Sequence, residues 1–147
     1  MADQRLHARL NVIVANAAVF YYKLHNYHWF VTGKQFFTLH NKFEELYDHW
    51  TELMDDVAER LLTIGGRPPA TLAEALKDAT IQEETGKPSP AEMVQHTLED
   101  MKSQLTVMRE AIVLAEESED RGTANVLDEF CDEIEKTIWM LEAWLEK

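Results

Sequence analysis

The sequence predicts an all-α protein whose architecture is a four-helix bundle. The chain has 147 residues, 46% of them hydrophobic, which suffices for one domain with a sizeable core and is too short for two. Its five glycines and four prolines gather in short stretches where helices should end. Between these stretches lie four long segments in which apolar residues recur at spacings of three and four. We therefore expect a single domain over residues 1–147.

The four helical segments follow one another with clear breaks between them. The first runs from about Leu6 to Phe30, and the second from about Phe37 to Ile64. The third begins after Ser89, whose hydroxyl suits an N-cap position three residues ahead of Glu92. The fourth begins near Thr123, just after a glycine. Each segment has one apolar stripe, so the four should pack with these stripes facing inward.

The connection between the second and third segments is long. Within it, residues Thr71 to Ala79 (TLAEALKDA) are predicted to form a short extra helix. A crossover of that length is typical of ferritin-like bundles, in which one connection spans the length of the molecule. A plain bundle with a long loop is the alternative.

Composition indicates a cytoplasmic protein without a membrane span. No run of about 18 apolar residues occurs, and the first residues, MADQRLHARL, lack the layout of a signal peptide. The single cysteine, Cys131, falls on an apolar stripe, so we interpret it as a core residue and not as a reactive thiol. The formal net charge of −13 repels phosphate backbones and lipid headgroups and attracts cations, although ordinary solubility by itself accounts for such a charge.

Five side chains of metal-binding type occur at regular intervals on the first two segments. His40 and Glu44 are four residues apart, as are Asp55 and Glu59, and this spacing places two side chains on one face of a helix. His28 precedes them, near the end of the first segment. The second pair lies on the same face as the first, about 16 Å further along the helix axis. Two pairs so far apart cannot bind the same ion.

Packing of the second segment against its own copy would bring the two pairs together. If two copies lie antiparallel across a twofold axis, the His40 and Glu44 end of one meets the Asp55 and Glu59 end of the other. Imidazole and carboxylate without thiolate suit iron, manganese or zinc. The spacing therefore predicts metal held between subunits. A diiron centre inside the bundle is not expected, because the sequence contains no Glu-x-x-His spacing.

Other candidate residues flank this set. His25 lies three residues before His28, where it is either a partner of the metal-binding histidine or an ordinary surface histidine. Trp29 adjoins His28, and its oxidisable indole could trap stray oxidising equivalents. His49 lies nine residues from His40, about 180° round the helix, and is excluded from the site.

The segment from His28 to His40 (HWFVTGKQFFTLH), followed by Glu44 and then by Asp55 to Pro69 (DDVAERLLTIGGRPP), resembles the Dps family of miniferritins. This resemblance implies a homo-oligomeric, dodecameric shell that oxidises Fe(II), preferably with hydrogen peroxide rather than oxygen. It also implies that the shell stores ferric mineral inside and protects against oxidative stress.

The resemblance further implies how the ligands are divided. His28, His40 and Glu44 would come from one subunit and Asp55 and Glu59 from its twofold-related neighbour. These five residues would be both the metal ligands and the catalytic residues, with room for two iron ions at each intersubunit site. Position 44 is commonly Asp in this family, so Glu44 is a conservative departure.

The family also has an acidic pore on its threefold axes, near the start of the last helix, as the iron entrance. The candidates in this sequence, which would otherwise be ordinary solvated charges, are Glu119, Asp120, Asp128 and Asp132.

DNA binding is not expected by the route that the family uses. Its DNA-binding members carry a lysine-rich terminus, whereas residues 1–9 here offer only Arg5 and Arg9 beside Asp3. Two rival functions stand beside the ferroxidase. One is a nucleoid protein that protects DNA without a dominant ferroxidase role, and the other is a metal-free helical scaffold.

Overall fold

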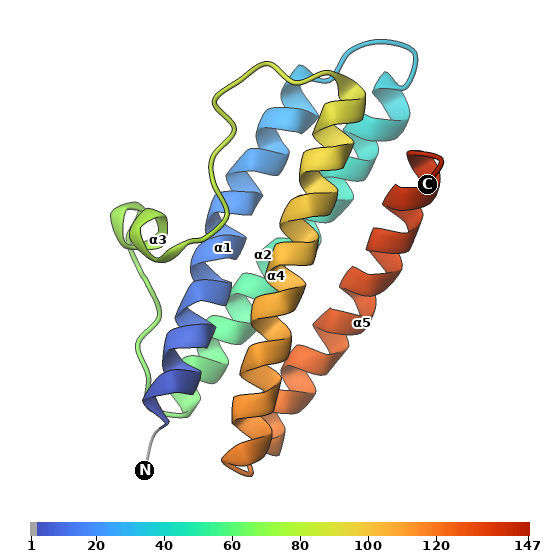
Figure 1. Cartoon of the computed structure of the whole chain (residues 1–147). Coiled ribbons are helices and arrows are strands. Elements are labelled where there is room, and N and C mark those ends of the chain that lie inside the picture. The colour runs from blue at the N-terminus through green and yellow to red at the C-terminus, as the bar shows by residue number, and fades with distance from the viewer. Residues whose placement is uncertain (1–2) are drawn as a thin grey trace.

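Four long helices form a bundle in the computed structural model, which describes residues 3–147 (Figure 1). The described residues contain no strand, and the all-α prediction is confirmed. The long helices are α1 (Gln4–Phe30), α2 (Phe36–Thr63), α4 (Pro90–Glu117) and α5 (Arg121–Trp144), and the short helix α3 (Leu72–Asp78) lies between α2 and α4.

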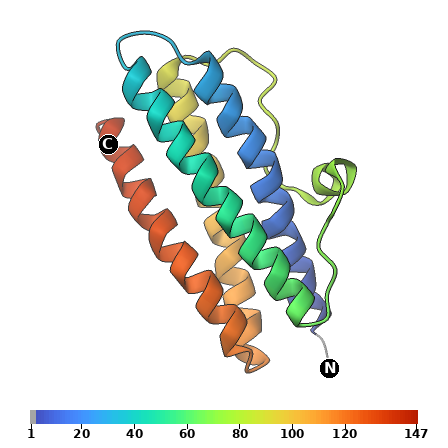
Figure 2. The same ribbon diagram turned by 180° about the vertical axis from the view of Figure 1, so that it is seen from behind.

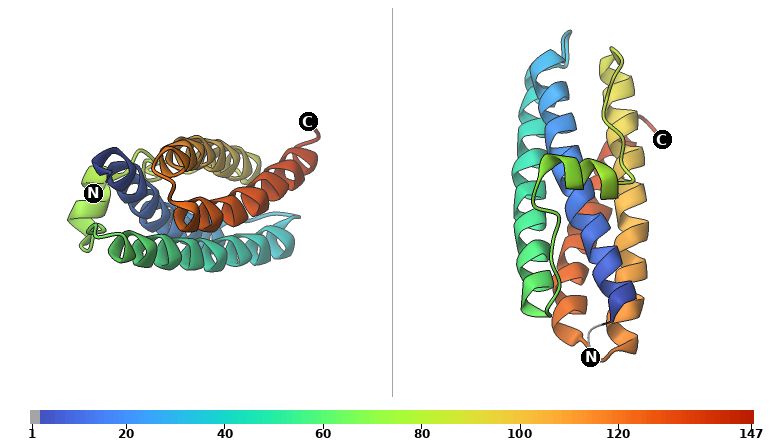
Figure 3. Two further views of the ribbon diagram at one scale, coloured as in Figure 1. Left: turned by 90° about the horizontal axis from the view of Figure 1, so that it is seen from below. Right: turned by 90° about the vertical axis from the view of Figure 1, so that its left-hand side faces the viewer.

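The long crossover determines the direction of the helices. It returns the chain to the end of the bundle at which α2 began, so that α2 and α4 run the same way (Figure 1). α1 packs along α2, α4 packs along α5, and α1 also contacts α4. Figure 2 shows the same arrangement from behind, and Figure 3 shows the crossover and α3 lying across the outside of α1. The ferritin-like bundle with a short extra helix is therefore the observed fold.

Local capping explains where the later helices begin. The Ser89 hydroxyl accepts a hydrogen bond from the Glu92 N–H, and the Glu92 carboxylate accepts one from the Ser89 N–H. This reciprocal pair satisfies two backbone donors at the start of α4, as the sequence predicted. The Thr71 hydroxyl caps α3 by accepting from the Glu74 N–H.

The interior of the bundle is apolar. Trp50 and Phe20 lie at its centre, with ring centroids 4.3 Å apart, and neither side chain is exposed. The predicted interpretation of Cys131 as a core residue agrees with its burial, which also raises the pKa of its thiol to about 11. Among the described residues, no Asp or Glu side chain is fully buried. The bundle centre therefore offers no carboxylate pair for a metal ion.

Buried polar side chains attach the crossover to the bundle. The side-chain oxygen of Asn16, Oδ1, accepts hydrogen bonds from the backbone N–H groups of Thr80 and Ile81, at 2.7 and 3.0 Å. The Asn16 amide donates to Gln104 at 2.9 Å. One side chain thus satisfies two backbone donors of an otherwise irregular segment, which defines where the crossover lies on α1.

A second attachment follows a few residues later. The Glu84 carboxylate accepts hydrogen bonds from the Tyr27 hydroxyl at 2.7 Å and from Nδ1 of His96 at 2.9 Å. Burial acts to raise the pKa of Glu84, but these bonds hold it below its ordinary value. The sequence analysis did not find this cluster, because its members are 12 and 57 residues apart and form no local pattern.

None of the helices in residues 3–147 is long and apolar enough to cross a membrane.

Candidate metal centre

The short link between α1 and α2 brings the first two candidate ligands together. Val31 ends α1 in an extended conformation with its side chain buried. Gly33 then turns the chain at a φ of 96°, where a side chain would be strained. The Phe36 N–H donates to the Gly33 carbonyl at 3.1 Å as α2 begins. This link places His28, near the end of α1, beside His40 of α2.

His28 and His40 lie face to face and bind each other's backbone. Their ring centroids are 3.7 Å apart, and the rings are inclined by 15°. Nδ1 of each ring donates to the backbone carbonyl of the other residue, both at 2.7 Å. Because a carbonyl oxygen can only accept, both neutral rings carry their proton on Nδ1. Both Nε2 atoms are therefore left with a lone pair for a metal ion.

Glu44 lies one helical turn beyond His40 and belongs to the same half of the site. Its Oε1 is 3.9 Å from Nε2 of His28. The Glu44 side chain is 53% exposed, whereas the His28 side chain is only 10% exposed. A cation at the two Nε2 atoms would therefore be reached by a carboxylate that still has room to adjust.

Asp55 and Glu59 form the other half, exposed further along α2. A hydrogen bond with Asp55, and then the negative charge of Asp55, raise the pKa of Glu59 above its ordinary value. Two carboxylates this close repel each other when both are ionised, and a bound cation would remove that repulsion. The pair is therefore suited to a metal ion.

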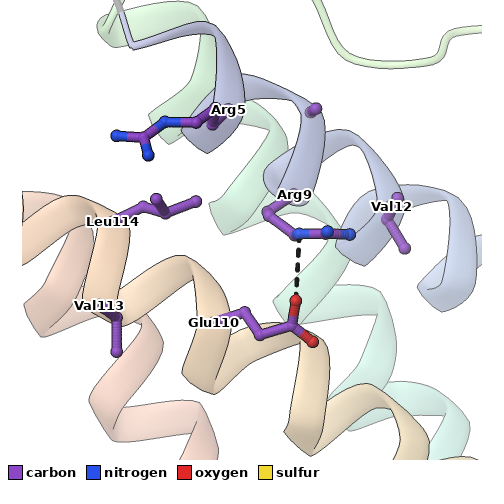
Figure 4. Close-up of a pocket in the computed structure, with 7 residues that line it drawn as sticks. Arg5, Arg9, Val12, Glu110, Val113 and Leu114 are labelled. Atoms are coloured by element: carbon purple, nitrogen blue, oxygen red, sulfur yellow. Dashed lines mark ion pairs between the residues drawn. The ribbon is translucent and has the colours of Figure 1, made fainter.

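The part of the chain that the structure describes holds no complete metal site. Among residues 3–147, no three His, Cys, Asp or Glu side chains are grouped so that they could hold an ion. The groove in Figure 4, of about 550 Å³ between α1 and α4, offers no such group either. Its Arg9 and Glu110 are paired with each other, with 3.3 Å between Nε and Oε2. The histidine half and the carboxylate half remain separate within one protomer.

The flanking residues of the sequence analysis lie close to the histidine half. His25 donates from Nδ1 to the Tyr21 carbonyl at 2.9 Å, and its ring centroid is 6.4 Å from that of His28. Trp29 is 55% exposed, with its ring 5.2 Å from that of His25. His25 thus contacts His28 through ring packing and not through a hydrogen bond.

His49 lies on another side of α2. Its Nε2 is 2.8 Å from a carboxylate oxygen of Glu133 on α5. This places it away from the histidine half, in agreement with its exclusion on helical spacing.

The pore candidates lie along the first turns of α5 and just before it. Asp120 caps α5 by accepting from the Thr123 N–H at 3.1 Å, and it also accepts from Nη2 of Arg60 at 2.7 Å. Burial acts to raise the pKa of Asp120, but the bonds from Thr123 and Arg60 hold it below its ordinary value. Its carboxylate is thus engaged within the chain. The exposed members of the set are Glu119, Asp128 and Asp132.

Two aromatic residues beside the histidines were missed by the sequence analysis. The Phe36 ring stacks on His40, and the Tyr47 ring stands edge-on to His28. Phe36 is four residues before His40 and Tyr47 is seven residues after it, so both lie on the ligand face of α2. The spacing rule that found the ligands could have found these two residues as well.

Comparison with known proteins places this fold and helix order in one family. The ferritin-like domain family matches residues 7–147. A "DNA protection during starvation protein" from Brevibacillus brevis is 50% identical over 137 residues, which cover 93% of this chain and 92% of that protein. "General stress protein 20U" of Bacillus subtilis is 44% identical over 145 residues and 99% of each chain. This chain belongs to the Dps family.

Solved Dps structures agree with this assignment. A crystal structure of a Dps protein from Bacillus brevis has a TM-score of 0.95 and 47% identity, with 99% of both chains covered. A Dps protein from Vibrio cholerae O1 has a TM-score of 0.93 and 39% identity, with 97% of this chain and 89% of that chain covered. The latter is described as a member of a broad superfamily of ferritin-like diiron-carboxylate proteins. The resemblance stated from the sequence is confirmed.

Proposed function

We propose that this Dps-family protein is a ferroxidase and iron-storage protein whose catalytic site forms between two subunits of a dodecameric shell. The observation that carries the proposal is the separation of the candidate ligands into two half-sites. His40 and Glu44 lie near the start of α2 beside His28 of α1, and the exposed pair Asp55 and Glu59 lies on the same face of α2 about 16 Å further along. Neither half provides enough ligands alone.

A second copy of the chain would complete the site. When α2 packs antiparallel against its own copy across a twofold axis, each histidine half meets the carboxylate half of the partner. A surface groove that α2 shares with α1 and α3 is compatible with such a contact. The groove has a volume of about 610 Å³ and is bordered by Met54 and by the exposed residues Tyr22, Leu72 and Leu76. An apolar surface of this kind is suited to burial between subunits.

The ligand set suits oxidation of iron. Fe(II) binds the two Nε2 lone pairs and the carboxylates, which stabilise Fe(III) more strongly because its charge is higher. With two Fe(II) ions in one site, each gives one electron to a hydrogen peroxide molecule. The peroxide O–O bond breaks, and two protons complete two water molecules. Both electrons are thus delivered together, so that no hydroxyl radical is released.

The acidic surface supports the storage role. The formal net charge of −13 per chain attracts Fe(II), and bound iron would partly neutralise this charge in an assembled shell. Glu119, Asp128 and Asp132 are exposed near the start of α5 and are the candidate iron entrance. We place this activity in the cytoplasm, where consumption of iron and peroxide together protects against oxidative stress.

The test is anaerobic titration with Fe(II), followed by one pulse of hydrogen peroxide. We expect saturable Fe(II) binding and fast formation of Fe(III) at one peroxide for every two iron ions. His40→Ala should slow the reaction strongly, whereas His49→Ala is a matched control on another side of the same helix. Equal rates of iron oxidation in the two variants would show that the wrong histidine had been assigned. If the protein bound no Fe(II), the alternative of a metal-free helical scaffold would be favoured.

Protection of DNA is the second candidate function. It is favoured by the name of the Brevibacillus brevis relative, "DNA protection during starvation protein". The charge of −13 and the scarcity of basic residues in residues 1–9 oppose direct DNA binding. We expect no shift of plasmid DNA in a gel at 150 mM salt without added metal. A shift under those conditions would favour the nucleoid function.

A further inference from the structure

The two metal-binding imidazoles are enclosed in a larger group of packed rings. Phe36 covers the outer face of His40, with centroids 4.9 Å apart and an angle of 21°. His40 in turn lies 3.7 Å from His28 at 15°, and the Tyr47 ring packs against His28, 5.4 Å away and perpendicular to it. Each ring of the histidine pair thus contacts one aromatic ring that is not a candidate ligand.

Tyr47 is itself held in place. Its ring also contacts that of Tyr21, at 5.8 Å, and that of His25, which stacks on it with centroids 3.7 Å apart and an angle of 20°. His25 is fixed at one ring atom, because its Nδ1 donates to the Tyr21 carbonyl at 2.9 Å. These contacts therefore connect His28, through Tyr47 and His25, to the backbone carbonyl of Tyr21.

An imidazole needs such support to act as a ligand of defined direction. The torsion between Cβ and the ring has broad minima, so that a ring with open faces tilts and flips. The hydrogen bond from Nδ1 constrains one atom of each ring but leaves rotation about that bond. A flat neighbour on the outer face restricts the remaining rotation, because any tilt would drive the ring into it.

We propose that Phe36 and Tyr47 are positioning residues, which hold the planes of His40 and His28 so that both Nε2 lone pairs point toward the intersubunit metal. His25 supports the orientation of His28 indirectly, because its ring stacks on Tyr47. The proposal rests on the proposed function for the identity of the ligands. The ring orientation that it explains belongs to the metal-free chain and can be measured without iron.

The chain offers a matched control for Phe36. Phe37 is the next residue in α2, but its side chain is 78% exposed and its ring packs on that of Phe36, at 5.3 Å, and not on either histidine. Leucine at either position keeps an apolar side chain and has a higher helix propensity than phenylalanine. Phe36→Leu therefore removes the flat surface on His40 without weakening the start of the helix, and Phe36→Tyr keeps that surface.

The first measurement is the solid-state ¹⁵N spectrum of metal-free protein labelled at its six histidines. The His28 and His40 signals are assigned by their loss in His28→Gln and His40→Gln. In the wild type both residues should give one sharp Nδ1–H tautomer. Phe36→Leu should broaden or divide the His40 signals, and Tyr47→Leu those of His28. Phe36→Tyr, Tyr47→Phe and Phe37→Leu should keep the wild-type spectrum.

The second measurement is the affinity of the assembled protein for Co(II). Binding is monitored by the visible absorption of the bound Co(II). Phe36→Leu should weaken binding about tenfold, in the range typical for residues that orient metal ligands. Phe36→Tyr and Phe37→Leu should bind as the wild type does, and thermal unfolding shows that each variant is folded.

Sharp signals and unchanged affinity in both leucine variants at positions 36 and 47 would overturn the proposal. So would an equal loss in Phe37→Leu, since this would indicate general loosening of the helix start. If the wild type itself bound no Co(II), the proposed function would fail, while the tautomer spectra would still decide whether the rings are held by Phe36 and Tyr47.

Discussion

The two halves of the candidate centre share α2, with His28 of α1 added to one of them, but they differ in how they are held. His28 and His40 are stacked, bonded to each other's backbone and covered by neighbouring rings. Asp55 and Glu59 are exposed, and the charge of each opposes that of the other. The histidine half is therefore organised without metal, whereas we expect the carboxylate half to become ordered when metal binds. The proposed shared site would combine one rigid and one adjustable contributor.

The largest expected effect tests whether the two halves really belong to one site. One variant carries His28→Ala with His40→Ala, and the other carries Asp55→Ala with Glu59→Ala. Each alone should lose fast iron oxidation by more than about a hundredfold, since direct ligands matter more than the groups that orient them. Co-assembled shells should recover up to about half of the wild-type rate, because each mixed twofold pair contains one complete site and one empty one.

Stopped-flow absorbance of Fe(III) measures this recovery, with mixed shells verified by native mass spectrometry. Mixed shells as slow as either parent would refute the division between subunits. Normal rates in either parent would show that the ligands had been wrongly named.

The carboxylate end of α2 is attached to the start of α5 by side-chain hydrogen bonds from Arg60. Arg60, next to Glu59, binds Asp120 and Thr123 of α5 at 2.7 and 3.0 Å. Asp120→Ala removes both this charge-assisted bond and the N-cap of α5, so it should lower the free energy of unfolding by about 2 kcal/mol. The figure is modest because the Arg60 and Asp120 side chains remain 27% and 17% exposed. Urea unfolding at pH 7 measures it.

The contact between Arg60 and Asp120 should weaken in acid. The folded pKa of Asp120 lies below its ordinary value of 3.8, so the folded state binds fewer protons there than the unfolded state does. The stabilisation is thus complete above 3.8 and is lost as pH falls through the folded pKa. Asp120→Asn keeps the cap but has no charge to lose. Its stability deficit against the wild type should therefore shrink below pH 3.8, and a constant deficit would contradict the role of the charge.

The rigid histidine half should depend on the turn that joins its two helices. Gly33 has a φ of 96°, and no atom lies within 4 Å of the position that a Cβ would occupy, so Gly33→Ala acts through backbone strain alone. We expect a loss of about 1–2 kcal/mol in unfolding free energy. Gly86→Ala is the control, because Gly86 does not have a positive φ and its Cβ would meet one flexible carboxylate at 3.4 Å. Equal losses in the two variants would argue against strain as the cause.

The smallest effect concerns the repulsion in the carboxylate half. The raised pKa of Glu59 means that the folded chain binds more protons than the unfolded chain, so this contribution to stability falls as pH rises through that pKa. Glu59→Gln should therefore raise the melting temperature of metal-free protein slightly at pH 7 and leave it unchanged at pH 4, while metal binding is weakened. A lower melting temperature at pH 7 would mean that Glu59 has a stabilising partner.

Helical spacing was enough to predict much of this protein. Breaks at glycine and proline, with apolar stripes between them, predicted four long helices and the short helix in the crossover, because both features depend on residues near in the chain. The pairs His40 with Glu44 and Asp55 with Glu59 follow from the same rule. Asp55 is the main cause of the raised pKa of Glu59, while the assignment of both pairs as metal ligands stays a prediction.

Contacts between distant segments could not be predicted in this way. Nothing near His96 in the sequence indicates Glu84 and Tyr27 as its neighbours. Asp120 was a pore candidate by sequence, yet the fold brings Arg60 against it from 60 residues away. Local patterns fail at such positions because the partner is chosen by the packing of whole helices.

Helical spacing predicts which faces of α1 and α2 carry the candidate ligands, since the helical repeat depends only on covalent geometry and local hydrogen bonds. The orientation of those side chains depends on the tertiary structure. The fold stacked His28 on His40 through the turn at Gly33, set both protons on Nδ1 and placed Phe36 and Tyr47 against the rings. The physical reason is that tautomer and ring plane depend on atoms across the α1–α2 interface, which come together only when the bundle packs.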